Sequence, residues 1–336
     1  MPLVPMKQVL AEARKGRYGV GAYNVNNMEQ IQALMQGASE TGTPIILQAS
    51  KGALEYSKMI YLKHLIQAAV EDNPDLPVVC HLDHGPDLEV CKQAIALGFT
   101  SVMIDGSIDY AKKDANGGHP ARTFEDNVAV TKAVCEYAHP RGVSVEGELG
   151  TLGGIEDETQ ASSIHLTDPD EVEEFVARTG VDALAIAIGT SHGAYKFKEA
   201  PTLALDLVPK ISEKAGDASL VMHGSSSVPQ DLVEIINKYG GAMKKSMGVP
   251  MDQIQEAIKL GVQKINVDTD GRLAFTGNIR KYLFEHPEVF DQRKYLGAGR
   301  QGIYDVMKQK MIDFGTAGHA DDYKPATLEQ AKAWYK

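Results

Sequence analysis

The chain has 336 residues, of which 43% are hydrophobic and 24% are charged, so it can bury a sizeable core. Its formal net charge is −11 and it has no long basic run. This argues against nucleic acid as a partner, since affinity for nucleic acid depends on clustered lysine and arginine. An anionic small molecule is compatible with this charge, because a local site can oppose the global field.

The cysteine content and the apolar runs bear on the compartment. The three cysteines, Cys80, Cys91 and Cys135, form no CxxC pair, and such sparse thiols fit a reducing environment. Residues 1–10 show no secretion signal, and no apolar stretch reaches membrane-spanning length. We therefore expect a cytoplasmic protein with no membrane partner.

One unit recurs along the chain: a short apolar run that ends in polar or glycine residues, followed by an amphipathic stretch. We expect strands at residues 18–24, 44–50, 77–84, 99–106, 143–150, 183–192, 220–225 and 262–268. We expect helices between them, among others at residues 28–41, 88–97, 127–139 and 250–260. Strands that alternate with helices indicate a parallel sheet, and continuously apolar strands indicate a sheet covered on both faces.

Eight such units predict one α/β domain over residues 1–336, a single (β/α)₈ TIM barrel. The competing open, doubly wound sheet would need a glycine-rich turn after the first strand, and residues 23–27 (YNVNN) are not one. Two segments exceed the repeat. One is a polar insertion at residues 109–123, after the fourth strand, and the other is a helical C-terminal extension that follows Arg272.

The strands end in residues that carry chemistry. In a barrel these ends converge on one face, where such enzymes keep their active sites, and a convergent set of His, Asp and Glu is typical of a metal or acid–base site. The strand-end residues are Asn24, Ser50, Asp83, His84, Asp105, Glu146, Glu148, His192, His223, Asn266 and Asp268.

Three histidines, His84, His192 and His223, occupy equivalent strand ends. A single histidine there would be interpreted as a hydrogen-bonded loop residue, but three imidazoles with one open position are a common catalytic zinc arrangement. The sequence therefore predicts that these three bind a metal ion. We expect His81, which alternates away from the strand end, to be structural.

Asp83 precedes a predicted metal ligand in the segment HLDHG at residues 81–85. Both Asp83 and His84 can reach the site only if the backbone turns, and we expect residues 85–86 (GP) to supply that turn. A carboxylate beside a metal ligand can act as a general acid or base. The alternative is that Asp83 caps the helix that starts near Asp87.

Glycine-rich and hydroxyl-rich segments follow two of the histidines. Residues 223–227 (HGSSS) precede a predicted helix, and small residues with backbone N–H groups at a helix start can bind an anion. Phosphate sites formed by the loops after strands seven and eight recur in this fold. Residues 151–158, which are glycine-rich and acidic, are either a mobile lid that carries a carboxylate or a solvated surface loop.

Six motifs follow one another along the chain: HLDHG at 81–85, VEGELG at 145–150, GGIED at 153–157, IGTSHG at 188–193, HGSSS at 223–227 and NVDTD at 266–270. Through these motifs the chain resembles the class II fructose-1,6-bisphosphate aldolases along nearly its whole length. The insertion at residues 109–123 and the segment YKP at residues 323–325 are similar to the bacterial branch associated with carbon fixation.

The resemblance implies specific roles. His84, His192 and His223 would bind catalytic Zn²⁺, with Asp83 as the acid and base on the aldehyde oxygen and Glu156 as the base towards dihydroxyacetone phosphate. The resemblance also implies a second divalent metal at Asp105 and Glu148. It implies a triose-phosphate site, with a monovalent cation nearby, formed by Gly193, Gly224, Ser226, Asp268 and Thr269. Contacts to the rest of the substrate would come from Ser50, Lys196, Arg272 and Arg293, and Asn24 and Asn266 would line the site.

The implied function is reversible aldol cleavage of a phosphorylated sugar, in glycolysis, gluconeogenesis and the Calvin cycle, by a homodimer or homotetramer. No lysine Schiff base is required, so Lys264 needs no catalytic role. Three alternatives stay open: a tagatose-bisphosphate aldolase, a metallohydrolase on the same fold, and a non-catalytic scaffold. The intact Asp83 and the three histidines argue against the scaffold.

Overall fold

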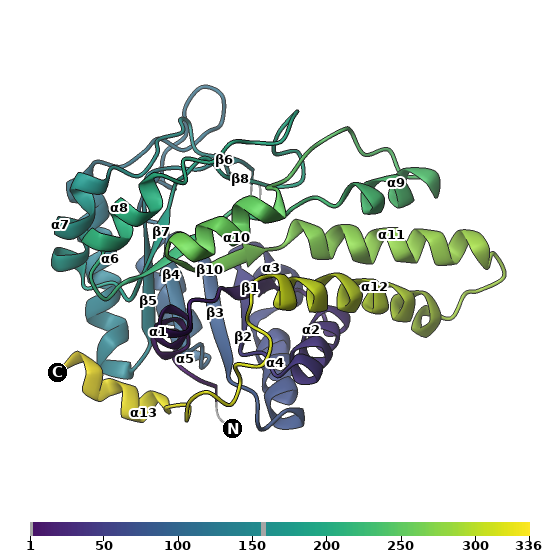
Figure 1. The fold of residues 1–336 in the computed structure, drawn as a ribbon, viewed down its shortest axis with the longest axis horizontal. Coiled ribbons are helices and arrows are strands. Elements are labelled where there is room, and N and C mark those ends of the chain that lie inside the picture. The colour runs from purple at the N-terminus through teal and green to yellow at the C-terminus, as the bar shows by residue number, and fades with distance from the viewer. Residues whose placement is uncertain (1–2, 156–158) are drawn as a thin grey trace.

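The computed structural model describes residues 3–155 and 159–336. Within these ranges, parallel strands form a closed barrel in the order β1-β10-β9-β7-β5-β4-β3-β2, and helices surround it (Figure 1). The predicted TIM barrel is confirmed. The barrel strands are β1 Val20–Asn24, β2 Ile45–Ser50, β3 Val78–Gly85, β4 Ser101–Ile104, β5 Ser144–Leu149, β7 Ala183–Ile186, β9 Ser219–Met222 and β10 Val262–Val267.

The helices follow the strands as the repeat predicts. One predicted helix, at residues 28–41, matches α2 residue for residue, and its N-cap Asn27 accepts a hydrogen bond from the Gln30 backbone. The helices are α1 Met6–Gly16, α2 Met28–Thr41, α3 Lys51–Ser57, α4 Met59–Asp72, α5 Leu88–Ala96, α6 Phe124–Ala138, η1 His139–Arg141, α7 Pro169–Thr179, α8 Leu207–Lys214, α9 Gln230–Lys238, α10 Met251–Leu260, α11 Thr269–Glu285, α12 Gln292–Asp313, α13 Leu328–Ala331 and η2 Lys332–Tyr335.

The sixth predicted strand, at residues 183–192, is divided in two. β7 ends at Ile186, and Ser191–His192 form a separate strand, β8, which pairs in parallel with β6 Gly153–Gly154. Gly189 adopts φ +98°, which an extended strand cannot contain, so the chain leaves the barrel before it reaches His192. The prediction that His192 ends a barrel strand is therefore wrong, although it still lies at the carboxyl end of the barrel.

The side chains inside the barrel change from apolar at the amino end to polar towards the carboxyl end. At the amino end, α1 packs Met6 and Leu10 against inward-facing apolar side chains such as Ala22 and Ile46, and together they form a continuous core. Further along the strands, the inward positions become polar. Gln48, His81, Glu146 and Lys264 are fully buried there. The apolar strands thus fix the barrel, and their last inward residues build the site.

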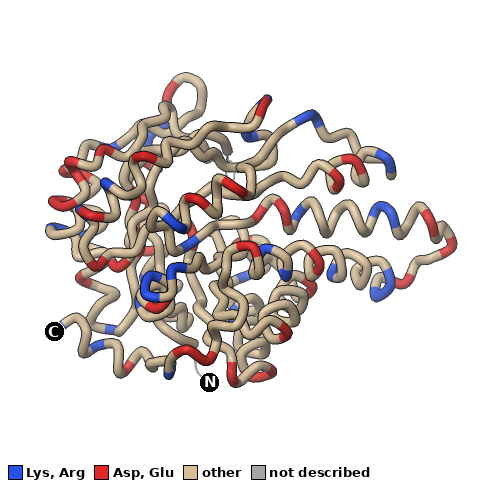
Figure 2. The backbone as a smooth tube through the Cα atoms, in the orientation of Figure 1, with Lys and Arg blue, Asp and Glu red and all other residues tan. Residues whose placement is uncertain are grey.

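The two segments beyond the repeat occupy different places. The insertion closes on itself through an antiparallel bridge between Ile108 and Ala121. The C-terminal extension, which follows Arg272, includes most of α11 and then α12, which packs against α11 and α2. These two helices project from the barrel as an antiparallel pair (Figure 1). In Figure 2, Lys and Arg are scattered among Asp and Glu along the chain. No helix in the described ranges has the length and apolar run that a bilayer crossing requires.

Candidate active site

Asp83 lies at the centre of the carboxyl-end layer of the barrel and is 1% exposed. Its Oδ2 accepts hydrogen bonds from Asn24 Nδ2 and Gln48 Nε2, both at 3.0 Å, and its Oδ1 accepts one from Asn266 Nδ2 at 3.2 Å. Three neutral amides therefore orient this buried carboxylate, which lines a pocket where it could act as an acid or base towards a bound substrate.

Sequence reasoning missed Gln48. It lies two residues before Ser50, so both side chains face the barrel interior, and Gln48 Nε2 also donates to Asn24 Oδ1 at 2.7 Å. A glutamine inside an otherwise apolar strand was the available signal, because a buried amide needs partners.

His84 reaches the site beside Asp83 because the backbone is irregular there. The pairing of β3 with β4 shifts register between Leu82 and Gly85, and His84 adopts φ +48°, which is unusual for a residue other than glycine. The predicted turn at residues 85–86 is therefore wrong by one residue: His84 itself bends the strand. The alternative role of Asp83 is also wrong, since Asp87 caps α5 by accepting from Val90 N at 2.9 Å.

The three predicted histidines come together. One ring nitrogen from each of His84, His192 and His223 lies within 4.8 Å of the others, and His223 Nδ1 is 2.9 Å from His84 Nε2. Burial, followed by the nearby His84, holds the pKa of both His192 and His223 well below the usual value. Neutral imidazoles are the form that binds a metal, so this donor set fits a divalent cation such as zinc.

A second candidate group shares His84. Its ring and the carboxylates of Asp105 and Glu148 also offer ligand atoms within 4.8 Å of one another. Burial acts to raise the pKa of Asp105, but His84, Ser107 and Tyr110 outweigh it and hold this pKa below the usual value. Burial and the Asp105 charge raise the pKa of Glu148 well above the usual value. Within the described residues, Glu148 Oε2 has no hydrogen-bond partner, so a cation fits here as well.

Glu146 orients His223 from below. Its Oε1 lies 2.7 Å from His223 Nε2, and its Oε2 forms an ion pair with Lys264 Nζ at 2.9 Å, with all three side chains buried. Because Glu146 holds one ring nitrogen, the other, Nδ1, is directed to the histidine cluster. His81 lies in the same layer, 3.4 Å from Lys264 Nζ, and not in the cluster, as expected for a structural residue.

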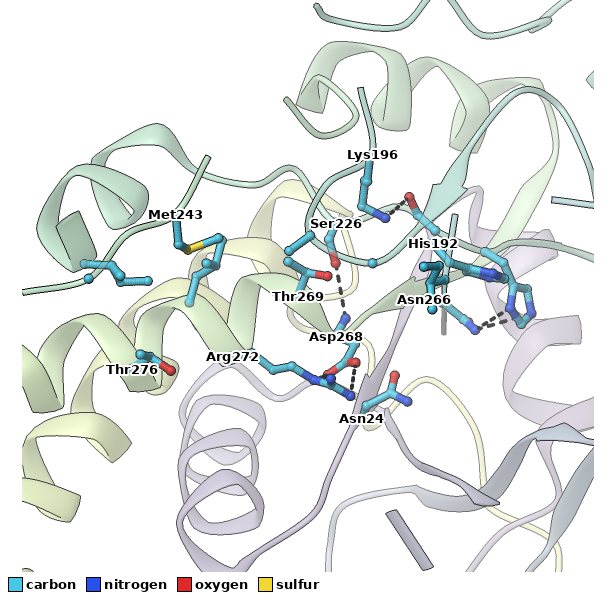
Figure 3. A pocket seen from close by; sticks show the side chains of 18 of the residues that line it. Asn24, His192, Lys196, Ser226, Met243, Asn266, Asp268, Thr269, Arg272 and Thr276 are labelled. Carbon is cyan, nitrogen blue, oxygen red and sulfur yellow. Dashed lines mark hydrogen bonds and ion pairs between the residues drawn. The ribbon is translucent and has the colours of Figure 1, made fainter. Parts of the chain in front are cut away.

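A pocket of about 380 Å³ opens beside the cluster (Figure 3). Gly224, at φ +62°, lies so close to the Ser191 backbone that a Cβ would be 2.5 Å from the Ser191 oxygen. Lys196 Nζ donates to Gly224 O at 2.8 Å, and Ser226 Oγ accepts from Asp268 N at 3.2 Å. The predicted residues that line this pocket are Asn24, Asp83, His192, Gly193, Lys196, His223, Gly224, Ser226, Asn266, Asp268, Thr269 and Arg272.

The pocket can accept an anion. Thr269 is the first residue of α11, and a helix N-terminus directs backbone N–H groups and a partial positive charge at the space in front of it. Lys196 and Arg272 add positive charge from two other sides, although Arg272 pairs with Asp268 at 2.6 Å in this state. The interpretation of these loops as a phosphate site is consistent with this geometry.

Two predicted residues lie outside this arrangement, and a third is not among the described residues. Ser50 is buried beside Asp83 in the strand register, but its hydroxyl caps α3 by accepting from Ala53 N at 3.3 Å. Arg293 is 85% exposed at the start of α12 and pairs with Asp291 at 2.7 Å, so the chain does not bring it to its own pocket. Glu156 lies outside the described residues.

A closed parallel barrel with an imidazole cluster, a buried carboxylate and an anion pocket at its carboxyl end defines a metal-dependent TIM-barrel enzyme. The family model described as "Fructose-bisphosphate aldolase class-II" matches residues 4–319. The chain belongs to this class II, metal-dependent aldolase family, and it is a lyase that acts on phosphorylated sugars. This membership excludes the metallohydrolase and scaffold alternatives.

Individual relatives agree with this assignment. A fructose-bisphosphate aldolase of Giardia intestinalis is 57% identical, with both chains covered in full. The plasmid-encoded fructose-bisphosphate aldolase of Cupriavidus necator is 50% identical, again over the whole of both chains. Among solved structures, the YdjI aldolase of Escherichia coli K12 matches with a TM-score of 0.73 at 26% identity, over 95% of this chain and 100% of that one.

Proposed function

We propose that this chain catalyses the reversible, zinc-dependent cleavage of D-fructose 1,6-bisphosphate to dihydroxyacetone phosphate and D-glyceraldehyde 3-phosphate, in glycolysis and gluconeogenesis. One observation carries the proposal: His192 and His223 line the anion pocket and also belong to the imidazole cluster. A sugar phosphate held in the pocket therefore presents its neighbouring carbonyl to the cluster and to Asp83.

Each group of residues has a separate role in the proposed reaction. His84, His192 and His223 would hold the zinc ion, which when bound polarises the carbonyl oxygen and stabilises the negative charge that develops there. Asp83, oriented by its three amide partners, takes the proton from the C4 hydroxyl as the C3–C4 bond breaks. Asp105 and Glu148 would hold a second divalent metal, and a monovalent cation would bind near the loop that contains Ser226.

Glu156 is proposed as the group that gives a proton to C3 of the departing triose phosphate and removes it in the reverse direction. Its neighbours in sequence support this, since Gly153–Gly154 pair with Ser191–His192 and so connect that loop to a metal ligand. The Glu156→Gln variant should slow exchange of the dihydroxyacetone phosphate proton with deuterated solvent more than it weakens binding. Unchanged exchange would assign the base elsewhere.

A second substrate, sedoheptulose 1,7-bisphosphate, is favoured by one feature. A cavity of about 470 Å³ is lined by His84 and His192 and extends to Tyr110 and Arg122 of the insertion region. This space supports a longer sugar chain beyond the reacting carbons, and with it a role in the Calvin cycle.

The assembly is proposed to be a homodimer or homotetramer in which Arg293 serves a neighbouring site. Three buried, unpaired cysteines agree with a cytoplasmic location.

A coupled assay for triose phosphate tests these proposals with fructose, tagatose and sedoheptulose bisphosphates, each with and without chelator. We expect fastest cleavage of the fructose compound, slower cleavage of the sedoheptulose compound, loss of activity after chelation, and recovery on adding zinc. Full activity in a metal-free sample, or inactivation by borohydride with substrate present, would contradict the zinc mechanism. Faster cleavage of the tagatose compound would reassign the substrate.

A further inference from the structure

A buried ion pair lies beneath the loop that follows β9. Lys310 Nζ is 2.7 Å from Asp270 Oδ2, and their side chains are 4% and 0% exposed. The two residues come from distant elements. Asp270 is the second residue of α11, next to the pocket-lining Thr269, whereas Lys310 lies in the last turn of α12, in the C-terminal extension.

The carboxylate of Asp270 holds the backbone of this loop. Its Oδ2 accepts from Ser227 N at 2.8 Å and from Ser227 Oγ at 3.0 Å, and its Oδ1 accepts from Val228 N at 2.8 Å. Lys310 Nζ also donates to Ser227 Oγ at 3.0 Å. Val228 adopts φ +49°, a conformation that is strongly unfavourable for a β-branched side chain and persists only where its surroundings impose it. The Asp270–Lys310 pair supplies that constraint.

The same loop is held from its other side. Val249 N donates to Ser226 O at 3.1 Å, and a Cβ on Gly248 would lie 2.3 Å from that oxygen. Ser226 is therefore fixed between Gly248–Val249 and the turn that Asp270 holds. Its hydroxyl accepts from Asp268 N and lines the anion pocket (Figure 3).

We propose that Lys310 is a positioning residue for the phosphate-binding loop: through Asp270 it fixes the strained turn at Ser227–Val228 and so places Ser226 and its neighbours in the pocket. The inference rests on the proposed function, since it takes the pocket as the triose-phosphate site.

The energetics of burial support a functional role. A buried ion pair contributes little net stability compared with well-packed apolar side chains, because desolvation offsets the attraction. A carboxylate that must accept several hydrogen bonds at once, however, has to stay ionised, and a buried carboxylate stays ionised when a cation is adjacent. Lys310 meets this need at a place where an apolar residue could not.

The test compares Lys310→Met with Lys310→Arg, which keeps the charge, and with Lys308→Met as the control. Lys308 lies on the same helix but pairs with Glu40 at 2.6 Å, away from the loop. For Lys310→Met we expect the KM for dihydroxyacetone phosphate in the condensation direction to rise about tenfold, which corresponds to one lost hydrogen bond to a charged group. The inhibition constant of inorganic phosphate should rise in parallel, with kcat and zinc content nearly unchanged.

Lys310→Arg should recover most of the affinity, and Lys308→Met should match the wild type. A folded Lys310→Met protein with normal KM and normal phosphate inhibition would overturn the proposal. If Lys310→Met does not fold, the Asp270→Asn variant tests the proposal instead, because asparagine keeps the shape of the aspartate side chain and removes its charge. Normal phosphate affinity in Asp270→Asn would also overturn the proposal. Calorimetric binding of inorganic phosphate distinguishes failure of the proposed function from failure of the positioning role. Wild-type protein that binds phosphate but cleaves no sugar would refute the proposed function, while the phosphate affinity of the variants would still test the positioning role.

Discussion

The two ends of the barrel both bury charge, but they use it differently. At the amino end, Asp182 is fully buried and forms an ion pair with Lys7 at 2.9 Å, while Val145 N, His139 Nε2 and Tyr335 OH lie within hydrogen-bond distance of its other oxygen. The charges and hydrogen-bonding groups at this end therefore pair with one another. At the carboxyl end, Asp83 and the histidines are held from below and directed at a cavity.

The comparison separates stability from activity. Polar groups that pair with each other connect α1, the residue before β7 and the η2 helix near the C-terminus, so breaking them should destabilise the fold. Polar groups that are directed at a cavity can bind a substrate or a metal ion, so removing them should lower activity. This matches the general division of TIM barrels into a stabilising amino end and a catalytic carboxyl end. The two aspartate predictions below each act on one end and should leave the other unaffected, whereas the last concerns a residue at neither end.

The largest expected effect is at the carboxyl end. Asp83→Ala should lower kcat by a factor on the order of 10²–10⁴, because a positioned acid–base group is lost. The three histidines are untouched, so zinc content measured by atomic absorption and the melting temperature should stay close to the wild-type values.

Asp87→Ala is the matched control, since Asp87 caps α5 and is the next carboxylate along the chain after Asp83. It should lose about 1 kcal/mol of stability, as expected for a lost N-cap, with kcat unchanged. A near-normal kcat in Asp83→Ala would remove Asp83 from the chemistry and contradict the interpretation of the carboxyl end as the catalytic end.

The next largest effect is at the amino end. Asp182→Ala should lower the free energy of unfolding by about 3–5 kcal/mol, because one half of a buried ion pair is removed and Val145 N loses its acceptor. Urea denaturation measures this loss, and kcat of the folded enzyme should not change. Asp217→Ala, an exposed carboxylate at the same end, should alter neither quantity.

The pH dependence of stability sharpens this prediction. Burial acts to raise the pKa of Asp182, but His139, Lys7 and Val145 N outweigh it and hold this pKa below the usual value of about 3.9. A carboxyl whose pKa is depressed on folding contributes stability above its unfolded pKa and loses it as the pH falls through the folded value. The wild type should therefore lose stability below about pH 4 more steeply than Asp182→Ala. Parallel acid-unfolding curves would show that Asp182 is not the responsible group.

The sequence predicted which residues come together at the candidate site because they are marked by position. Asp83, His84 and His223 follow apolar runs, and strand ends converge in any parallel barrel. Gln48 was missed, and Glu146 was expected at a strand end although it lies inside β5. Both residues are inside strands, where the contacts of a side chain depend on whether it faces the inside or the outside of the barrel. The sequence around Lys310 does not predict its burial, because it is typical of a lysine on the surface of a helix. Only the packing of α12 buries this side chain.

The smallest expected effect concerns Arg293, which belongs to neither end of its own barrel. It is the second residue of α12, where α11 and α12 project from the barrel (Figure 1). Its exposed pair with Asp291 contributes little stability. If it reaches the distal phosphate of a substrate in a neighbouring subunit, Arg293→Ala should raise the KM for fructose 1,6-bisphosphate about tenfold, since a guanidinium donates charge-assisted hydrogen bonds to phosphate.

Proton exchange on dihydroxyacetone phosphate, which lacks the distal phosphate, should be unaffected in this variant, and Lys294→Ala should behave as wild type. The subunit question has a separate test, in which an inactive His192→Ala chain is refolded together with an Arg293→Ala chain. If the arginine acts across a subunit contact, some mixed sites combine three intact histidines with an intact arginine. At low substrate the mixture should then exceed the sum of the two variants. Verified mixed oligomers without this gain would place Arg293 in its own subunit's site or outside any site, and the carboxyl end would then bind both phosphates with its own residues.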